Sequence, residues 1–152
     1  MRTVFKNAVI ITPYREVAGS VVVENGKITQ VIAGDCSDIH PEDEVIDAQG
    51  RYLAPGFIEL HTHGAGGHDF MDGSIDAIIQ ACQTHMRHGI TALLPTTLSS
   101  KDEELFENLA MIDEAAKIKD SMPEILGSHL EGPYFSPPQN AAQDKRYIKP
   151  PT

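Results

Sequence analysis

Three short apolar runs alternate with two amphipathic helical patterns, and this alternation constrains the fold more than any other feature of the sequence. The runs are Tyr52–Leu60, Ile90–Leu94 and Ile125–Leu130. Between them, apolar residues recur at the spacing of one helical face. In the first pattern these residues are Ile75, Ile78, Ile79, Cys82 and Met86. Strands that alternate with helices are typical of βαβ units with a parallel sheet.

Local signals predict where both helices begin and end. Ser74 can cap the first helix, and Gly89 can end it in the left-handed conformation. Ser100, with Glu103 three residues later, matches a capping box for the second helix, which ends before Pro123. The second helix would bury the face formed by Leu105, Leu109, Ile112 and Ala116.

The first 52 residues predict β structure instead. A strand-like run from Thr3 to Thr12 is followed by Pro13, which cannot donate to a strand ladder. Asn25-Gly26 separates two runs rich in β-branched residues, which is the strongest short signal for a hairpin. Residues 35–47 are acidic and contain no Lys or Arg, which indicates a solvated loop. We expect a small β domain over 1–52 and an α/β domain over 53–152.

Composition excludes several classes of partner. With 12 basic and 22 acidic residues, the formal net charge is −10, which argues against nucleic acid and anionic membrane surfaces. No run approaches the ~20 apolar residues that span a bilayer, and no signal peptide is evident. The two cysteines lack a CxxC spacing, so a reducing cytoplasm is the expected location.

Two clusters of polar side chains follow predicted strands. His61 and His63 follow the strand Phe57–Leu60 and lie on the same side of the chain, where two imidazoles could hold one divalent ion. The alternative is a pair of surface histidines. His129 and Glu131 end the third strand in the same way. Glu131 could be a metal ligand or a general base, or it could cap a helix or form a salt bridge.

The remaining candidates are weaker. His85 and His88 close the first helix, where a partly positive side chain suits the helix dipole. His68 lies close to His63 in a glycine-rich loop and could orient that candidate ligand through a hydrogen bond. His40, in the acidic loop, is expected to be solvated, and Cys82 to be a core thiol.

Three stretches taken together resemble the N-acetylglucosamine-6-phosphate deacetylase family of the amidohydrolase superfamily. The hairpin Val21–Ile28 resembles the N-terminal β unit of that superfamily, and Leu53–Gly64 resembles its entry into the barrel, which ends in the HxH pair. Gly127–Phe135, with the sequence GSHLEGPYF, is similar to the deacetylases in particular. The resemblance extends over essentially the whole chain.

The resemblance implies a partial (β/α)8 TIM-type barrel, with its first three strands, preceded by part of a small β-sandwich. It implies hydrolysis of the acetamide of N-acetylglucosamine 6-phosphate, with one or two divalent ions, zinc or iron. By motif, Glu131 would bind the main metal, His61 and His63 a second metal, and the pair Ala142 and Gln143 the substrate. Ala141 stands where this loop is expected to have Gly.

The same resemblance implies groups outside these 152 residues. A catalytic Asp and two further histidine ligands would lie beyond Thr152, and the full-length protein would be a homodimer. A complete barrel takes roughly 250 residues. We therefore expect the isolated chain to be inactive and poorly stable. The alternatives are a chain without catalysis of its own, or another amidohydrolase that acts on a cyclic amide.

Overall fold

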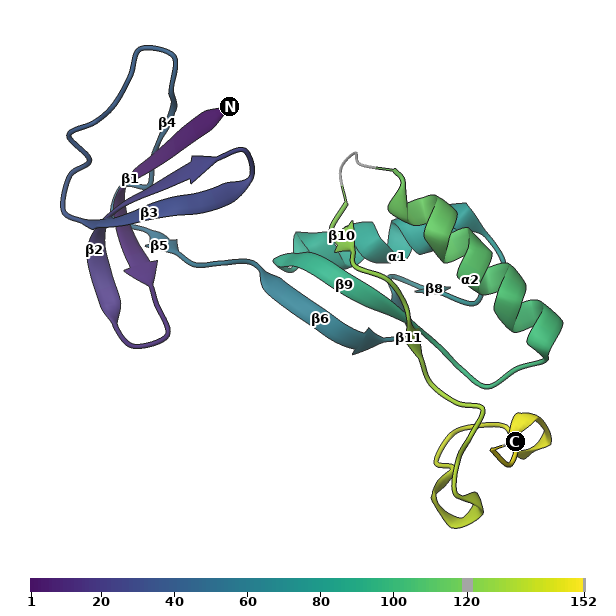
Figure 1. Ribbon diagram of the computed structural model, residues 1–152. Helices are drawn as coiled ribbons and strands as arrows, with labels where there is room; N and C mark the ends of the chain where they lie inside the picture. Colours follow the sequence, from purple (N-terminus) through teal and green to yellow (C-terminus); the bar gives the residue numbers. More distant parts are fainter. Residues whose placement is uncertain (119–121, 152) are drawn as a thin grey trace. The chain divides into compact units, whose positions relative to one another are not determined.

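The chain forms two compact units, which divide between Pro55 and Gly56 (Figure 1). The computed structural model describes residues 1–118 and 122–151. The boundary lies close to the one expected after residue 52, where the composition changes. Within the described residues, no helix has the length and apolar character needed to cross a membrane. The structure is a mixed α/β one, with the helices confined to the second unit.

The first unit is a five-stranded sheet built around its N-terminal strand (Figure 1). β1 (Arg2–Ile11) pairs antiparallel with β2 (Glu16–Glu24), which pairs antiparallel with β3 (Lys27–Ala33). β1 also pairs in parallel with β4 (Glu44–Asp47) and β5 (Tyr52–Leu53). The strand expected over 3–12 and the hairpin that follows it are therefore confirmed.

The hairpin between β2 and β3 depends on the two residues of its turn. Asn25 has φ 51° and Gly26 has φ 77°, as a type I′ turn requires. Neighbouring residues of β2 then point to opposite faces of the sheet. Val22 packs with Val4 and Cys36, whereas the adjacent Val21 packs in a separate cluster with Ala8 and Ile10. Both faces of this sheet consequently carry buried apolar side chains.

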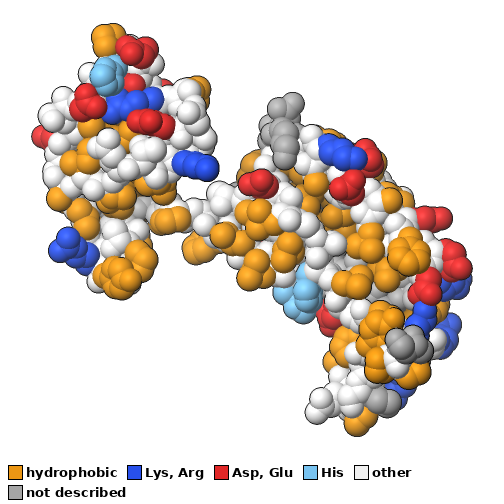
Figure 2. Space-filling view, viewed as in Figure 1, with side chains coloured by type: hydrophobic (Ala, Val, Ile, Leu, Met, Phe, Trp, Pro, Cys, Tyr) orange, Lys and Arg blue, Asp and Glu red, His pale blue; other side chains and the backbone are white. Residues whose placement is uncertain are grey.

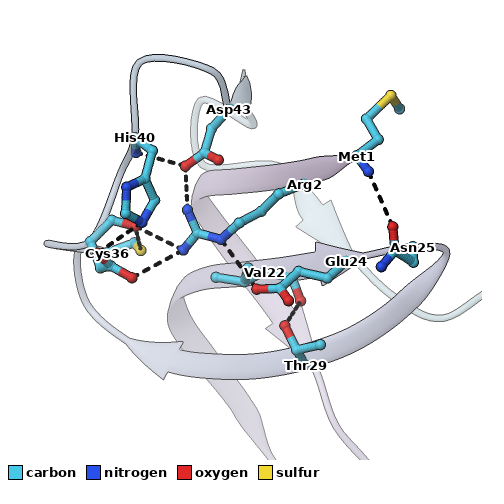
Figure 3. Close-up of polar contacts among 10 residues, drawn as sticks. Met1, Arg2, Val22, Glu24, Asn25, Thr29, Cys36, His40 and Asp43 are labelled. Carbon is cyan, nitrogen blue, oxygen red and sulfur yellow. Dashed lines mark hydrogen bonds and ion pairs between the residues drawn. The ribbon is translucent and has the colours of Figure 1, made fainter.

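The acidic segment 35–47 is not simply a solvated loop, and this corrects the expectation from the sequence. The guanidinium of Arg2 forms ion pairs with Glu24, Asp38 and Asp43 (Figure 3). The side chain of Asp43 is only 1% exposed, and that of Arg2 is 16% exposed. The neutralising cation comes from β1, about 40 positions away, so the composition of the segment alone could not reveal it. β4 also lies at the end of this segment.

The second unit contains a parallel sheet centred on β9 (Ile90–Thr97). β6 (Phe57–Thr62) and β10 (Glu124–Ile125) both pair with Ala92 and Leu93, so they must lie on opposite edges of β9. The expected single strand over 125–130 is interrupted. Its second part, β11 (His129–Leu130), pairs with Thr96 and Thr97 farther along β9.

Two helices cover one face of this sheet (Figure 1). α1 (Ile75–Arg87) is capped as predicted, since the Ser74 hydroxyl accepts a hydrogen bond from Ala77 N at 3.4 Å. Gly89, just beyond its end, has φ 89°. The helices and the sheet share one buried cluster, formed by Phe70, Ile78, Ala81, Cys82, Leu93, Ile112, Ala115 and Ile125.

The second helix departs from two predictions. α2 (Asp102–Ala116) begins after Lys101 without a side-chain cap, so the capping box at Ser100 and Glu103 is wrong. The Ser100 hydroxyl instead donates to the carbonyl of Lys101, because the helix begins one residue later than a Ser100 cap requires. The buried face is also rotated, because Asn108 and Ala115 are buried where Leu109 and Ala116 were expected.

Short elements complete the second unit. The loop after β6 forms a small hairpin from β7 (Gly64–Ala65) and β8 (His68–Asp69), and single 3-10 turns cover Pro137–Gln139 and Lys145–Tyr147. Several apolar side chains of β6 remain exposed, and Phe57 is 66% exposed. Figure 2 shows hydrophobic side chains gathered over the part of this unit that holds β6.

Candidate metal centre

Three side chains from two strand ends meet in the second unit. His61 lies in β6, His63 follows β6, and Glu131 follows β11. Because β6 and β11 both run parallel to β9, their C-terminal ends lie at the same end of the sheet. One ligand atom from each of the three residues lies within 4.8 Å of the others. The structure thus brings together the three residues that the sequence predicted as metal ligands.

The carboxylate of Glu131 lies between the two imidazoles. Its Oε2 is 2.8 Å from Nε2 of His61 and 3.1 Å from Nε2 of His63. The His61 side chain is 54% exposed and that of Glu131 is 24% exposed, so the site is open to solvent on one side. In both histidines it is Nε2 that faces Oε2 of Glu131.

Hydrogen bonds to the backbone hold the His61–His63 segment against the neighbouring strand. Thr62 N donates to Oγ1 of Thr96 in β9 at 3.0 Å, and His63 O accepts from Phe70 N at 2.8 Å. His61 N donates to the carboxylate of Glu59 at 3.0 Å. Because Thr62 is hydrogen-bonded to β9, His61 and His63 on either side of it both point toward Glu131.

Glu131 is held as a carboxylate by its surroundings. Burial raises the pKa of this carboxyl, but hydrogen bonds from Gln143 and His61, with His63 nearby, outweigh burial and hold the pKa below its usual value. The group is therefore ionised at neutral pH. An ionised carboxylate is the form that a divalent ion requires.

The donor set fits a divalent transition metal. Two imidazole nitrogens and one carboxylate oxygen are a known ligand set of catalytic zinc sites, which keep a fourth position for water. Ligands about 2.0 Å from a tetrahedral ion lie about 3.3 Å apart, which is close to the 2.8 and 3.1 Å observed here. The two distances from the carboxylate to the imidazoles are thus close to those of a bound ion.

A third imidazole lies beside this group. The ring of His129 is tilted by 46° against that of His61, with the ring centroids 4.7 Å apart. Among the described residues, Nδ1 of His63 and Nδ1 of His129 are buried and have no hydrogen-bond partner. The sequence predicted that His129 and Glu131 share one side of their strand, but it did not predict the contact with His61.

The other histidines lie outside this group. His85 Nε2 is 3.2 Å from Oγ1 of Thr62, a contact that the sequence did not predict, and His88 is the exposed C-cap of α1. His68 lies in β8 and, within the described residues, is not one of the group of three. His40 is exposed in the first unit, as expected, and its Nε2 lies 3.2 Å from the carboxylate of Asp38.

The predicted substrate residues differ in their exposure. Ala142 is exposed, whereas Gln143 is only 5% exposed, and its side-chain amide is hydrogen-bonded within the protein at both ends. Ala141 has φ 47°, in the left-handed region that favours glycine. Ala141 stands where Gly was expected, and its backbone conformation is one that is unfavourable for alanine.

Comparison with solved structures indicates a broad class of protein before it indicates a particular family. No family model matches the chain. A D-hydantoinase is similar with a TM-score of 0.58 and 26% identity, over 90% of this chain and 28% of that one. The described fold, with candidate metal ligands at the ends of parallel strands, therefore resembles that of the amidohydrolases.

Within that class the deacetylases are more similar. The crystal structure of N-acetylglucosamine-6-phosphate deacetylase from Pasteurella multocida has a TM-score of 0.82 and 32% identity, over 98% of this chain and 39% of that one. The curated deacetylases of the same name from Haemophilus influenzae and Bacillus subtilis are 29% and 31% identical to this chain over 150 and 135 residues, respectively. These matches cover 98% and 87% of this chain.

The chain spans 39% and 34% of the lengths of these two curated relatives. It is therefore similar to the N-terminal portion of N-acetylglucosamine-6-phosphate deacetylases.

Proposed function

We propose that this chain supplies the N-terminal part of a metal-dependent deacetylase that hydrolyses N-acetylglucosamine 6-phosphate to glucosamine 6-phosphate and acetate. The observation that carries the proposal is the convergence of His61, His63 and Glu131 at the ends of two parallel strands. The names of the relatives supply the substrate and the reaction.

We further propose that the second unit is the beginning of a (β/α)8 barrel and that the first unit is part of a small β-sandwich. The strand–helix alternation and the parallel pairing of β6, β9, β10 and β11 support the barrel. So do the exposed apolar side chains of β6, such as Phe57 and Ile58, because a closed barrel would cover them. The expected domain boundary, after residue 52, stays close to the division at Pro55.

In this proposal, His61, His63 and Glu131 hold one or two divalent ions, zinc or iron, with Glu131 on the main ion. A bound divalent ion lowers the pKa of a water molecule and polarises an amide carbonyl. The residues of this chain provide the ligands and orient them, since Thr62 is tied to β9 and Glu131 to Gln143. The substrate contact fits the exposed Ala142 better than the buried side chain of Gln143.

Other features support the expected location and partners of the protein. Both cysteines, Cys36 and Cys82, are free and buried, in keeping with a reducing cytoplasm. The net charge of −10 disfavours nucleic acid and anionic membranes as partners. A homodimer of the full-length protein remains part of the proposal on the family resemblance alone.

Two measurements test the proposed activity. The protein that carries this chain, loaded with Zn²⁺, should release acetate from N-acetylglucosamine 6-phosphate, and Glu131→Gln should abolish this release. Hydrolysis of a hydantoin instead of the sugar phosphate would favour the alternative of a cyclic-amide hydrolase, which rests on the weaker D-hydantoinase likeness. Turnover by the isolated 152-residue chain would contradict the proposal that it supplies only part of the site.

A further inference from the structure

The side chain of Gln143 connects Glu131 to the loop that follows β9. Its Oε1 accepts a hydrogen bond from the backbone N of Ser99 at 2.8 Å, and its Nε2 donates to Oε1 of Glu131 at 3.1 Å. Gln143 is 5% exposed and Ser99 is 7% exposed, so the bond between them is buried, whereas the bond to Glu131 is partly buried. A buried amide that uses both ends in this way is an expensive group to remove.

The orientation of this amide is fixed by its partner. A backbone N–H can only donate, so the carbonyl oxygen of the Gln143 side chain must face Ser99. The NH₂ group must then face the carboxylate of Glu131. Asn140 fixes the backbone of the same residue, because Asn140 Nδ2 donates to Gln143 O at 3.1 Å and Gln143 N donates to Asn140 O at 2.9 Å.

In this arrangement the two carboxylate oxygens of Glu131 have different partners. Oε1 accepts from Gln143, whereas Oε2 faces Nε2 of His61 at 2.8 Å and Nε2 of His63 at 3.1 Å. We propose that Gln143 is a positioning residue, which holds Oε1 of Glu131 so that Oε2 alone faces the two imidazoles with which it would hold the ion. This inference rests on the proposed metal site, and it gives Gln143 a role other than substrate contact.

The proposal also accounts for the fixed geometry of Glu131 beyond the end of β11. A glutamate has three rotatable side-chain bonds, and without a partner for Oε1 its carboxylate could turn away from the histidines. Hydrogen bonds to metal ligands fix the orientation of those ligands, and their loss typically lowers metal affinity about 10- to 100-fold.

The test compares Zn²⁺ binding by the protein that carries this chain and by its Gln143→Met variant, which keeps the approximate shape of the side chain but removes both hydrogen bonds. Zn²⁺ affinity is measured by calorimetry against a competing chelator, and the fold is checked by circular dichroism and thermal unfolding. We expect a loss of about 10- to 100-fold in affinity. Gln139→Met, at an exposed position of the same segment, is the matched control and should bind as the wild type does.

A second variant covers the case in which Gln143→Met does not fold. Gln143→Asn keeps a buried amide but is one methylene too short to reach Ser99 and Glu131 together, so it should also weaken Zn²⁺ binding. If either folded variant binds Zn²⁺ as tightly as the wild type, the positioning role is wrong. The same conclusion follows if only the affinity for N-acetylglucosamine 6-phosphate falls. If the unsubstituted protein that carries this chain does not bind Zn²⁺, the proposed metal site fails, and the positioning role fails with it.

Discussion

Oε2 of Glu131 lies 2.8 Å from Nε2 of His61, although 70 positions separate the two residues in the sequence. The two residues come from the ends of β11 and β6, and both strands pair with β9. The distance between the carboxylate and the imidazole is therefore set by the register of a parallel sheet. A site built in this way depends on the integrity of β9 as much as on its own side chains.

The first prediction concerns the start of α1. Ser74→Ala removes the hydroxyl that accepts from Ala77 N, and it should lower the free energy of unfolding by about 1 kcal/mol. Ser100→Ala is the matched control, because Ser100 does not cap α2, and it should change stability by less than about 0.5 kcal/mol. Urea unfolding followed by circular dichroism measures both. Equal losses for the two variants would contradict the observed difference in capping.

A second prediction concerns the buried ion pair of the first unit. Arg2→Met leaves the carboxylate of Asp43 buried without its cation, so it should lower the free energy of unfolding by about 3 kcal/mol. The control is Lys6→Met, since the Lys6–Asp47 pair is exposed and 3.8 Å long, and its loss should cost about 0–0.5 kcal/mol. Denaturant unfolding of both variants is the measurement. An Arg2→Met variant as stable as Lys6→Met would show that Arg2 does not compensate Asp43.

Ala141 supplies a third prediction, in which the sign of the effect is decisive. Ala141 has φ 47°, so Ala141→Gly relieves backbone strain and should raise stability by about 0.5 kcal/mol, after the entropy cost of glycine. Ala142→Gly at the next position relieves no such strain, and it should lower stability by about 0.5 kcal/mol. Thermal unfolding and the rate of proteolysis within residues 131–147 would report both changes. Stabilisation by neither variant would mean that Ala141 is not strained.

The fourth prediction is a dependence of stability on pH. Burial raises the pKa of the Cys82 thiol to about 11, above the ~8.5 of an unfolded cysteine. The folded state therefore retains this proton where the unfolded chain has lost it. The contribution of Cys82 to stability is fully present below about pH 8.5 and is lost as the pH rises toward 11.

Unfolding free energies measured at several pH values between about 8 and 11 test this dependence. Cys82→Ala should show a shallower decline than the wild type, whereas Cys36→Ala keeps Cys82 and should keep the steeper decline. Parallel curves for the wild type and Cys82→Ala would contradict the raised pKa.

Features that depend on neighbouring residues could be predicted from the sequence. The turn at Asn25-Gly26 and the cap at Ser74 follow from the chemistry of adjacent residues, and the structure confirms both. The alternation of strands and helices was predictable for the same reason, since periodicity is local. The residues His61, His63 and Glu131 were predicted from short motifs, and their meeting required only that the strands be parallel.

Features that depend on distant partners could not be predicted in this way. Asp43 is neutralised by Arg2 from β1, and Gln143 is fixed by Ser99 from the loop after β9. Ser100 had the right local pattern for a cap, yet α2 begins one residue later, and Lys149 pairs with Asp102 in its first turn. The interruption between β10 and β11 likewise depends on how each piece pairs with β9.

The most direct test of the metal site is calorimetric titration of the purified protein that carries this chain with Zn²⁺ at neutral pH. The wild type should bind in a saturable way, and Glu131→Gln, which replaces the carboxylate by an amide of the same shape, should bind at least about 10-fold more weakly. His88→Ala, at the exposed C-cap of α1, is the control and should bind as the wild type does. Equal affinity for the wild type and Glu131→Gln would contradict the assignment of Glu131, with His61 and His63, as the metal centre.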